Sequence, residues 1–388
     1  MKKKNLGFAT KAIHAGNKPD PETGSISPAV VLTTTFEQNE IGDDNGYDYS
    51  RAGNPTRTRW ETNIASLEGG KYGPAFASGM AAITTLFQYL HQGDHVLISH
   101  NVYGGTYRLI DEVLQYHGIE FDFINLADLE AVSARVKPNT KLIFAETPTN
   151  PLLELVDIRA LADICHRTGI ILAVDNTFLS PYGQRPLERG ADVVVHSSTK
   201  HLGGHSDVIG GVLVTDNDDL AQSFFMIQKS VGAIPNPFDC WLLLRSTKTL
   251  EVRVRQSESN AGKIARFLAD RKEFSRVIYP GLESHPQHAL AVEQQQTPEG
   301  NPFFGSIISI EFHERQKRDL FLKKLTLFKL AESLGGVESL ISNPYVMTHG
   351  AVPEKDKQAL GITRELIRLS VGIEAVDDLL SDLENALN

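Results

Sequence analysis

Three polar clusters follow apolar segments of this 388-residue chain and supply the side chains that could do chemistry. Each cluster begins where a predicted strand ends: Glu146–Pro151 after Lys141–Ala145, Asp175–Thr177 after Ile170–Val174, and Ser197–Lys200 after Asp192–Val195. Ligands collect at the carboxyl ends of strands in open α/β sheets, so we expect the clusters to meet at one site. One such cluster alone is also typical of a helix cap or a turn, but three together favour a site.

Lys200 and Asp175 are the two residues most suited to catalysis. Hydroxyl side chains precede Lys200, and Gly203 and Gly204 follow it, which lets the backbone approach closely. A lysine in a partly desolvated pocket loses proton affinity and becomes a nucleophile for carbonyl compounds. Pyridoxal 5'-phosphate (PLP), held as a Schiff base on a lysine, needs a carboxylate such as Asp175 to keep its ring nitrogen protonated. The pair therefore predicts a PLP site, with a solvated loop lysine as the alternative.

The phosphate of such a cofactor needs hydrogen-bond donors. Ser78, Gly79 and Met80 lie in a small-residue turn before an apolar segment, and free backbone N–H groups at a helix start bind anions. A plain helix cap is an equally good interpretation of this turn. Gly69–Tyr72 lacks the glycine and hydroxyl pattern of a nucleotide-binding P-loop, and no dinucleotide fingerprint is present.

Other reaction classes find little support. His285 and His288 have a metal-like spacing, but Pro286 separates them and no third ligand is adjacent, so we predict no metal site. No serine lies in a Gly-x-Ser-x-Gly turn, which argues against a hydrolase triad.

An alternation of apolar strands and amphipathic helices must position these clusters. Near-continuous apolar strands between helices predict a mostly parallel sheet covered on both faces. The expected strands are His95–Ser99, Ile119–Ile124, Lys141–Ala145, Ile170–Val174 and Asp192–Val195. The helix between the first two strands should present Leu109, Ile110, Val113 and Leu114 on one face and end at Gly118. A second helix should begin after Asp157 and end at Gly169.

The length of the chain exceeds the size at which one core usually stops growing, so two domains are expected. Residues 1–50 are irregular and rich in turn formers, which predicts an extended arm that contacts a neighbouring subunit. Residues 51–245 form the predicted large domain. Residues 246–388 form a smaller α+β domain with strands Ser306–Ile310 and Leu366–Ser370 and a final helix that ends at Leu387.

Composition limits the partners and the compartment. The 38 basic and 48 acidic residues give a net charge of −10, which argues against nucleic acid as a partner. Two cysteines cannot form a disulfide framework and are typical of a reducing compartment. Neither a signal peptide nor an uninterrupted apolar stretch of membrane-spanning length is visible. We therefore expect a cytoplasmic protein without membrane contact.

From about residue 8 to its end the chain resembles the Cys/Met-metabolism branch of the fold-type-I PLP enzymes. The motifs that carry the resemblance are Tyr49–Thr56, Ser78–Met80, Val102–Thr106, Glu146–Pro151, Val174–Phe178, Ser197–Lys200, Gly204–Asp207, Ala331–Leu340 and Leu366–Ser370. The resemblance implies the fold-type-I large domain, the smaller C-terminal domain and a homotetramer, a dimer of dimers with shared active sites.

The resemblance also implies roles for individual residues, which would contact either the PLP cofactor or an amino-acid substrate. Lys200 would hold PLP and move protons, and Tyr103 would stack on the ring and help protonate the leaving group. The cofactor would further contact Asp175, Asn150, Thr177, Ser78, Gly79, Met80, Ser197 and Thr199, and from a neighbouring subunit Tyr49 and Arg51. The substrate would meet Arg368, which would clamp its carboxylate with the help of Ser339, as well as Asn150 and, at its distal end, Glu338.

Within this family, the segments Tyr279–His288, Ile234–Cys240 and Ser180–Pro186 resemble the cystathionine γ-lyases most closely, whereas Glu338 is shared with the γ-synthases. Methionine γ-lyases carry a cysteine where this chain has Gly105, which argues against that activity. The implied reaction is γ-elimination of cystathionine to cysteine, 2-oxobutanoate and ammonia, with H₂S release from cysteine as a side reaction. Cystathionine γ-synthase, which replaces the γ-substituent of an O-acylhomoserine, and cystathionine β-lyase remain alternatives. A non-catalytic α/β protein that binds a phosphorylated metabolite, and an inactive family member kept for assembly, are the alternatives from other classes.

Overall fold

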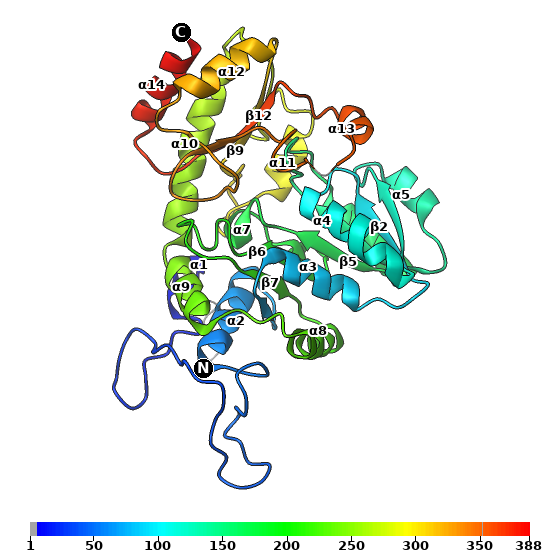
Figure 1. Ribbon diagram of the computed structural model, residues 1–388, viewed down its shortest axis with the longest axis vertical. Helices are drawn as coiled ribbons and strands as arrows, with labels where there is room; N and C mark the ends of the chain where they lie inside the picture. Colours follow the sequence, from blue (N-terminus) through cyan, green and yellow to red (C-terminus); the bar gives the residue numbers. More distant parts are fainter. Residues whose placement is uncertain (1–5, 351) are drawn as a thin grey trace.

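The computed structural model describes residues 6–350 and 352–388, which fold into two sheets with helices packed against them (Figure 1). The larger sheet has seven strands in the order β1-β7-β6-β5-β4-β2-β3. Its strands are β1 (Ala75–Phe76), β2 (His95–Ser99), β3 (Glu120–Ile124), β4 (Thr140–Glu146), β5 (Ile171–Asp175), β6 (Val193–Ser197) and β7 (Gly211–Val214). Strands β3, β2, β4, β5 and β6 are parallel, whereas β7 is antiparallel to β6 and β1. The mostly parallel sheet is confirmed, and β7 adds an antiparallel strand that the sequence analysis missed.

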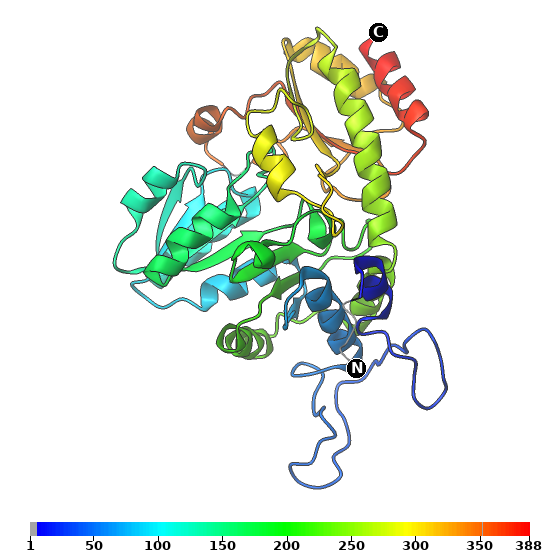
Figure 2. The same ribbon diagram turned by 180° about the vertical axis from the view of Figure 1, so that it is seen from behind.

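Helices cover both faces of the larger sheet, as the apolar strands require. One face shares a core with α3 (Gly79–Gln88), α4 (Gly104–Arg108) and its continuation, and α8 (Asp218–Val231). The other face packs against α5 (Leu129–Arg135) and α6 (Ile158–Thr168), and near β6 and β7 against α2 (Pro55–Glu68) and α9 (Pro237–Thr247). Figures 1 and 2 show the two sides in turn. Short turns of α7 (Ser180–Gly183) and η3 (Pro186–Arg189) connect β5 to β6.

Local sequence patterns predicted some helices accurately and others poorly. The Asp157 carboxylate accepts a hydrogen bond from the N–H of Ala160 at 3.0 Å, and Gly169 ends α6 with φ 68°, so both predicted caps of this helix are confirmed. The helix predicted before Gly118 is less regular than expected. It continues from α4 through a π-helical segment, η1 (Leu109–Val113), and a 3₁₀ turn, η2 (Leu114–His117). Ile110 and Leu114 are buried, but Val113 is about half exposed because the π segment shifts the face.

The smaller sheet lies beside the C-terminal half of α10 and has the strand order β10-β11-β12-β9-β8 (Figure 1). Its strands are β8 (Phe274–Ile278), β9 (Ile307–Phe312), β10 (Lys329–Leu330), β11 (Leu340–Ser342) and β12 (Leu366–Ser370). The C-terminal helices are α10 (Leu250–Ala269), α11 (His288–Gln294), α12 (Arg315–Lys324), α13 (Glu354–Leu360) and α14 (Val376–Leu387). Apolar side chains from α10, α12 and α14 form one core with this sheet, which confirms the smaller α+β unit.

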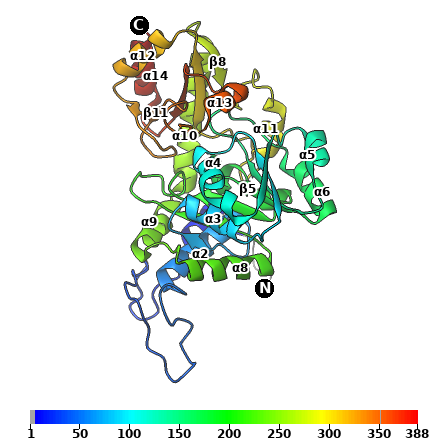
Figure 3. The ribbon, with the colours of Figure 1, turned by 45° about the vertical axis from the view of Figure 1, so that its right-hand side comes forward.

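The N-terminal segment is not irregular throughout. Helix α1 (Phe8–His14) packs on the body of the protein, where the Phe8 ring meets the edge of Tyr182 with centroids 5.4 Å apart. Residues 17–54 contain neither helix nor strand and extend away from the body as long loops (Figures 1 and 3). Ile26, Leu32 and Ile41 are 71% exposed or more on these loops. Apolar side chains this exposed are typical of a surface that contacts another chain.

Candidate active site

A cavity of about 240 Å³ lies where strands β4, β5 and β6 end, between the larger sheet and the smaller one. The three strand-end clusters meet there, as the sequence analysis predicts. The predicted residues that line this cavity are Ser78, Gly79, Met80, Tyr103, Asn150, Asp175, Thr177, Ser197, Thr199, Lys200 and Arg368. Arg368 comes from β12 of the smaller sheet, so the site depends on both units.

Lys200 projects into the cavity from the turn after β6. Its Nζ donates a hydrogen bond to Ser333 Oγ at 2.9 Å. Burial, and then the positive charge of Arg368, lower the pKa of this amine to about 8, while Glu332 opposes the shift. Gly204 holds the turn with φ 68°, and a Cβ there would lie 1.9 Å from Arg253 Nη1. The amine is therefore held in place and loses its proton far more easily than an ordinary lysine.

Asp175 ends β5 and is tied to the neighbouring strand through Thr177. Asp175 Oδ1 accepts a hydrogen bond from the N–H of Thr177 at 2.9 Å, and Thr177 Oγ1 accepts one from the N–H of Ser197 at 2.9 Å. Burial raises the pKa of Asp175, and the hydrogen bonds from Thr177 lower it. A cation facing this carboxylate would therefore be held strongly, because little solvent screens it.

Glu146 is a second buried carboxyl group beside Asp175, and the sequence analysis gave it no role of its own. The two residues are register partners on β4 and β5. Glu146 accepts hydrogen bonds from the backbone N–H groups of Tyr103 at 2.9 Å and Asn150 at 3.1 Å. Burial and the charge of Asp175 raise the pKa of Glu146. Its contacts position two lining residues and place a titratable carboxyl next to Asp175.

The start of α3 forms a close-packed cradle for an anion. Ser78 Oγ accepts a hydrogen bond from the N–H of Ala81 at 3.0 Å and so caps the helix, while the first N–H groups of a helix have no intrahelical acceptor. A Cβ on Gly79 would lie 2.8 Å from Ser197 Cβ, and one on Gly211 would lie 2.2 Å from the carbonyl oxygen of Ser78. Only glycine allows these approaches. The Thr199 hydroxyl is held nearby by Gly210, whose N–H donates to it at 3.1 Å.

Arg368 offers a fixed cation for an anionic substrate group. Nη1 donates to Asn150 Oδ1 at 2.9 Å and Nη2 to the carbonyl oxygen of Ser333 at 2.8 Å, whereas the buried Nε has no partner among the described residues. Burial lowers the pKa of Arg368 to about 10, which still leaves it charged near neutral pH. A buried guanidinium with donors to spare is suited to bind a carboxylate.

The resemblance implied that Glu338 and Ser339 contact the substrate, but the structure places another Glu–Ser pair of the same tract at the cavity. Glu332 and Ser333 line it, whereas Glu338 and Ser339 lie outside its lining. Glu338 accepts a hydrogen bond from the Ser206 hydroxyl, and the Ser339 hydroxyl donates to Glu374 at 2.9 Å. Both pairs belong to the tract Ala331–Leu340, so motif matching alone could not choose between them. The second pair leads directly into β11, which turns its side chains to other partners.

Tyr49 and Arg51 lie on the N-terminal loops and do not line the cavity of their own chain. Tyr49 is 46% exposed, and Arg51 Nη1 donates to the carbonyl oxygen of Lys229 at 2.7 Å. Figure 3 shows these loops extending away from the rest of the chain. Their expected contact with the cofactor of a neighbouring subunit stays a prediction.

Within residues 6–350 and 352–388, no group of three or more His, Cys, Asp or Glu side chains is arranged to hold a metal ion. His285 Nδ1 instead accepts from the N–H of Gln287 at 3.1 Å, and His288 contacts the carbonyl oxygen of Pro280. Among the same residues, the helices are all too short or too polar to cross a bilayer.

The donor set of the cavity fits PLP. The helix start and the nearby hydroxyls match a phosphate, Asp175 matches a protonated ring nitrogen, and Lys200 supplies an amine of lowered pKa. The orphaned Arg368 Nε provides a donor for a substrate carboxylate beside them. These features coincide in one cavity whose size suits a small ligand.

Comparison with known proteins agrees with this assignment. Residues 9–388 match the family model described as "Cys/Met metabolism PLP-dependent enzyme". The chain is 46% identical over 387 residues to a cystathionine γ-lyase of Bacillus subtilis, with 100% of this chain and 99% of that protein covered. It is 46% identical to a cystathionine β-lyase of Lactococcus lactis subsp. cremoris, with 97% and 98% covered. It is also 47% identical to a cystathionine γ-synthase of Mycobacterium bovis, with 98% and 97% covered.

A solved structure shares the whole fold. The cystathionine γ-lyase of Lactobacillus plantarum, complexed with L-serine, superposes with a TM-score of 0.95 at 45% identity and covers 98% of both chains. This agreement confirms the fold-type-I architecture and PLP as the cofactor. The relatives divide among lyases and a synthase, so they establish the family and leave the individual reaction open. This chain therefore belongs to the Cys/Met-metabolism family of PLP-dependent enzymes.

Proposed function

We propose that this enzyme is a cystathionine γ-lyase, which breaks the Cγ–S bond of cystathionine and releases cysteine, 2-oxobutanoate and ammonia. The observation that carries the proposal is that Lys200, Asp175 and Arg368 line one cavity. A nucleophilic amine, a carboxylate for the ring nitrogen and a clamp for the substrate carboxylate are the groups this chemistry requires. Membership of a PLP-dependent family leaves the phosphometabolite-binding alternative without support.

The residues around the cavity divide naturally into cofactor and substrate contacts. PLP, when bound, serves as an electron sink for negative charge that develops on the substrate carbons. Lys200 would hold it covalently, Asp175 would face its ring nitrogen, and the start of α3 with Ser197 and Thr199 would hold its phosphate. Tyr103 would lie against the ring. Asn150 would contact the ring hydroxyl and would also orient Arg368, from which it accepts a hydrogen bond.

The substrate would be held at both of its ends. Arg368 would bind the carboxylate next to the reacting carbons, because its Nε is unpartnered and its two Nη atoms are fixed by Asn150 and Ser333. Cystathionine also carries an ammonium group on its distal half. The exposed carboxylate of Glu332, on the same cavity, is suited to attract that group. We therefore assign to Glu332 and Ser333 the substrate contacts that the resemblance had placed at Glu338 and Ser339.

Proton transfers would fall to Lys200 and Tyr103. A pKa of about 8 lets the Lys200 amine take the proton from the substrate Cα and then from Cβ near neutral pH. Burial, and then the charge of Glu332, raise the pKa of Tyr103, so its hydroxyl stays protonated. That hydroxyl can donate a proton to the sulfur as the Cγ–S bond breaks. The substrate thus loses protons to one side chain and the leaving group gains one from the other.

The choice of γ-elimination over the related reactions rests on Gly105 and Glu332. Gly105 separates the chain from methionine γ-lyases, and the carboxylate of Glu332 disfavours an O-acylhomoserine with a second negative charge. Cystathionine γ-synthase and β-lyase remain the alternatives within the family. Release of H₂S from cysteine would follow as a side reaction of the same residues.

Product analysis with purified protein separates these reactions. With cystathionine as the substrate, 2-oxobutanoate and cysteine mean γ-elimination, whereas pyruvate and homocysteine mean β-elimination. A parallel reaction with O-succinylhomoserine and cysteine reports γ-replacement through the formation of cystathionine. Pyruvate as the main keto acid, or faster formation of cystathionine than its cleavage, would overturn the proposal. The Lys200→Ala protein is the control for cofactor chemistry in solution.

We further propose a cytoplasmic homotetramer in which residues 1–50 form the arm, 51–245 the PLP-binding domain and 246–388 the small domain. The exposed apolar side chains of the arm support a partner contact. Tyr49 and Arg51 would then reach the phosphate of the neighbouring subunit. Mixing Lys200→Ala chains with Arg51→Ala chains tests this sharing. A shared site predicts that hybrids regain activity, because one of their two sites carries neither defect, whereas unshared sites predict no recovery.

A further inference from the structure

Arg57 is a buried arginine that has no part in the proposed reaction. It lies in the first turn of α2 with its side chain 3% exposed, and it does not line the cavity. Its Nη1 donates to the carbonyl oxygen of Ser50 at 3.0 Å, and its Nη2 donates to those of Arg51 at 3.4 Å and Ala52 at 3.0 Å. A guanidinium presents its N–H groups in a rigid planar fork and can therefore meet several acceptors at once. Three consecutive carbonyl groups of the N-terminal loops thus share one side chain.

The turn that this guanidinium holds carries Tyr49 and Arg51, the two residues proposed to reach the phosphate of the neighbouring subunit. The carbonyl oxygen of Tyr49 accepts from the N–H groups of Ala52 at 2.8 Å and Gly53 at 3.0 Å, which closes the turn. The Arg51 guanidinium lies 5.5 Å from the centre of the Tyr49 ring, a cation–π contact that brings the two side chains together. Because residues 17–54 contain neither helix nor strand, side-chain hydrogen bonds must help to fix this turn.

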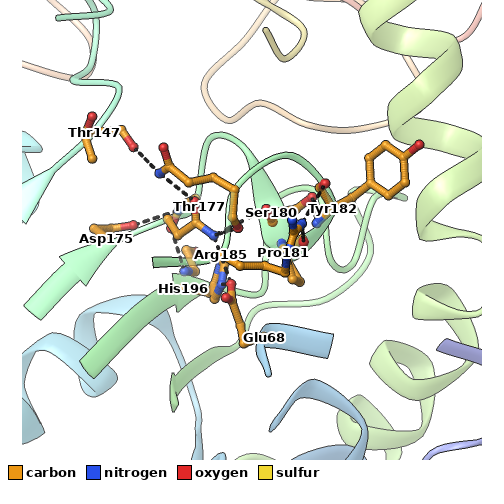
Figure 4. Close-up of polar contacts among 12 residues, drawn as sticks. Glu68, Thr147, Asp175, Thr177, Ser180, Pro181, Tyr182, Arg185 and His196 are labelled. Atoms are coloured by element: carbon orange, nitrogen blue, oxygen red, sulfur yellow. Dashed lines mark hydrogen bonds and ion pairs between the residues drawn. The ribbon is translucent and has the colours of Figure 1, made fainter. Parts of the chain in front are cut away.

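Arg57 is itself fixed, because α2 is anchored to the rest of the chain at several points. Glu61, one helical turn further along, lies 3.6 Å from Arg57 Nε and accepts a hydrogen bond from the N–H of Ala75 in β1 at 3.0 Å. At the end of the helix, the buried Glu68 contacts His196 of β6 (Figure 4). An ion pair with little exposure to solvent is held in one geometry when its atoms have further partners. The guanidinium therefore connects the N-terminal loops to a rigid part of the larger unit.

We propose that Arg57 is a positioning residue for the neighbouring subunit: it holds the turn so that Tyr49 and Arg51 meet the phosphate of PLP bound there. Ordering a flexible segment at the moment of binding lowers affinity, so a turn that is fixed beforehand binds the anion more tightly. Arg57 touches neither cofactor nor substrate and acts only through the turn. The inference rests on the proposed sharing of active sites between subunits.

The test compares PLP with pyridoxal, which has the same ring without the phosphate. The full-length protein is freed of cofactor and titrated with each compound, and binding is followed by absorbance. Arg57→Gln removes the fork of donors, and Arg51→Ala is the reference for a lost phosphate contact. Arg57→Lys keeps a cation beside Glu61 but cannot reach three carbonyl groups, and it provides the measurement if Arg57→Gln folds poorly.

The inference predicts a loss that is specific to the phosphate. Arg57→Gln should raise the dissociation constant of PLP by about tenfold, which corresponds to about 1.4 kcal/mol. The dissociation constant of pyridoxal should stay within about twofold, because pyridoxal has no phosphate for the turn to meet. A general structural role for Arg57 would weaken both compounds alike. Equal losses for the two compounds, or no loss for either, would overturn the inference.

A matched control lies two residues further along α2. Arg59 also donates to carbonyl oxygens of the N-terminal segment, those of Gly16 at 3.2 Å and Lys18 at 2.9 Å, which lie outside the turn that carries Arg51. Arg59→Gln should lower the melting temperature without selectivity between PLP and pyridoxal. A selectivity as large as that of Arg57→Gln would mean that any loosening of the segment has this effect, and the specific role of Arg57 would be refuted.

Hybrid proteins show in which subunit Arg57 acts. Activity is measured at a PLP concentration that leaves the Arg57→Gln protein mostly without cofactor. In a pair of one Lys200→Ala chain and one Arg57→Gln chain, one site combines an intact Lys200 with an intact arm, so activity should recover. Mixing Arg57→Gln with Arg51→Ala should give no recovery, because each site then receives a defective arm. Absence of recovery in the first mixture would mean that Arg57 acts within its own subunit, against the inference.

The Arg51→Ala reference separates the two levels of the argument. If Arg51→Ala shows no selectivity between PLP and pyridoxal and does not recover activity when mixed with Lys200→Ala, the proposed sharing of sites fails. If Arg51→Ala is selective and complements Lys200→Ala whereas Arg57→Gln does neither, only the present inference fails.

Discussion

The lowered pKa of Lys200 gives the most direct quantitative prediction. Burial and the charge of Arg368 lower this pKa from 10.5 to about 8. At pH 8 about half of the Lys200 amines are then neutral, compared with about 0.3% for an unperturbed lysine, a difference of about 150-fold. Only the neutral amine attacks a carbonyl group. The rate at which the cofactor-free protein captures PLP should therefore rise with pH up to about 8 and level off above it.

Stopped-flow absorbance over a pH series measures this capture rate. The sign follows from the cause: a positive neighbour disfavours the protonated amine, so its removal should move the midpoint to higher pH. Arg368→Gln removes the neighbouring charge and should shift the midpoint upward. Arg108→Gln removes an exposed charge on α4 that does not contribute to Lys200 and should leave the midpoint in place. A capture rate of the unaltered protein that keeps rising beyond pH 10 would refute the reasoning.

Substitutions at Lys200, Arg368, Glu332 and Glu338 test individual roles. Lys200→Ala should abolish both turnover and the covalent cofactor, and after borohydride reduction mass spectrometry should find the adduct on Lys200 in the unaltered protein alone; an active variant would contradict the assignment. Arg368→Gln should raise KM by about tenfold or more, since charge-assisted hydrogen bonds contribute about 1.5–3 kcal/mol, with the visible absorbance of bound cofactor unchanged. Glu332→Gln should raise KM for cystathionine severalfold and Glu338→Gln should not, and the reverse order would restore the assignment made from the motif.

Local sequence determined much of the larger unit. Apolar runs bounded by polar clusters predicted five parallel strands, and Asp157 and Gly169 predicted both ends of α6, because strand burial and helix caps are encoded by neighbouring residues. The carboxyl ends of parallel strands share one edge of the sheet. That single geometric rule allowed Asp175 and Lys200 to be placed together without a structure.

Other features depended on contacts between distant parts of the chain, which no local pattern encodes. Strand β7 pairs antiparallel with β6. Glu332 lines the cavity, whereas Glu338 lies just before β11 and outside the cavity lining. The pairing of Glu68 with His196 joins the end of α2 to β6. The sequence alone therefore determined which residue types could do the chemistry and on which strands they lie. Only the tertiary structure decided which buried charges meet, because their energies depend on burial and on partners far away in the sequence.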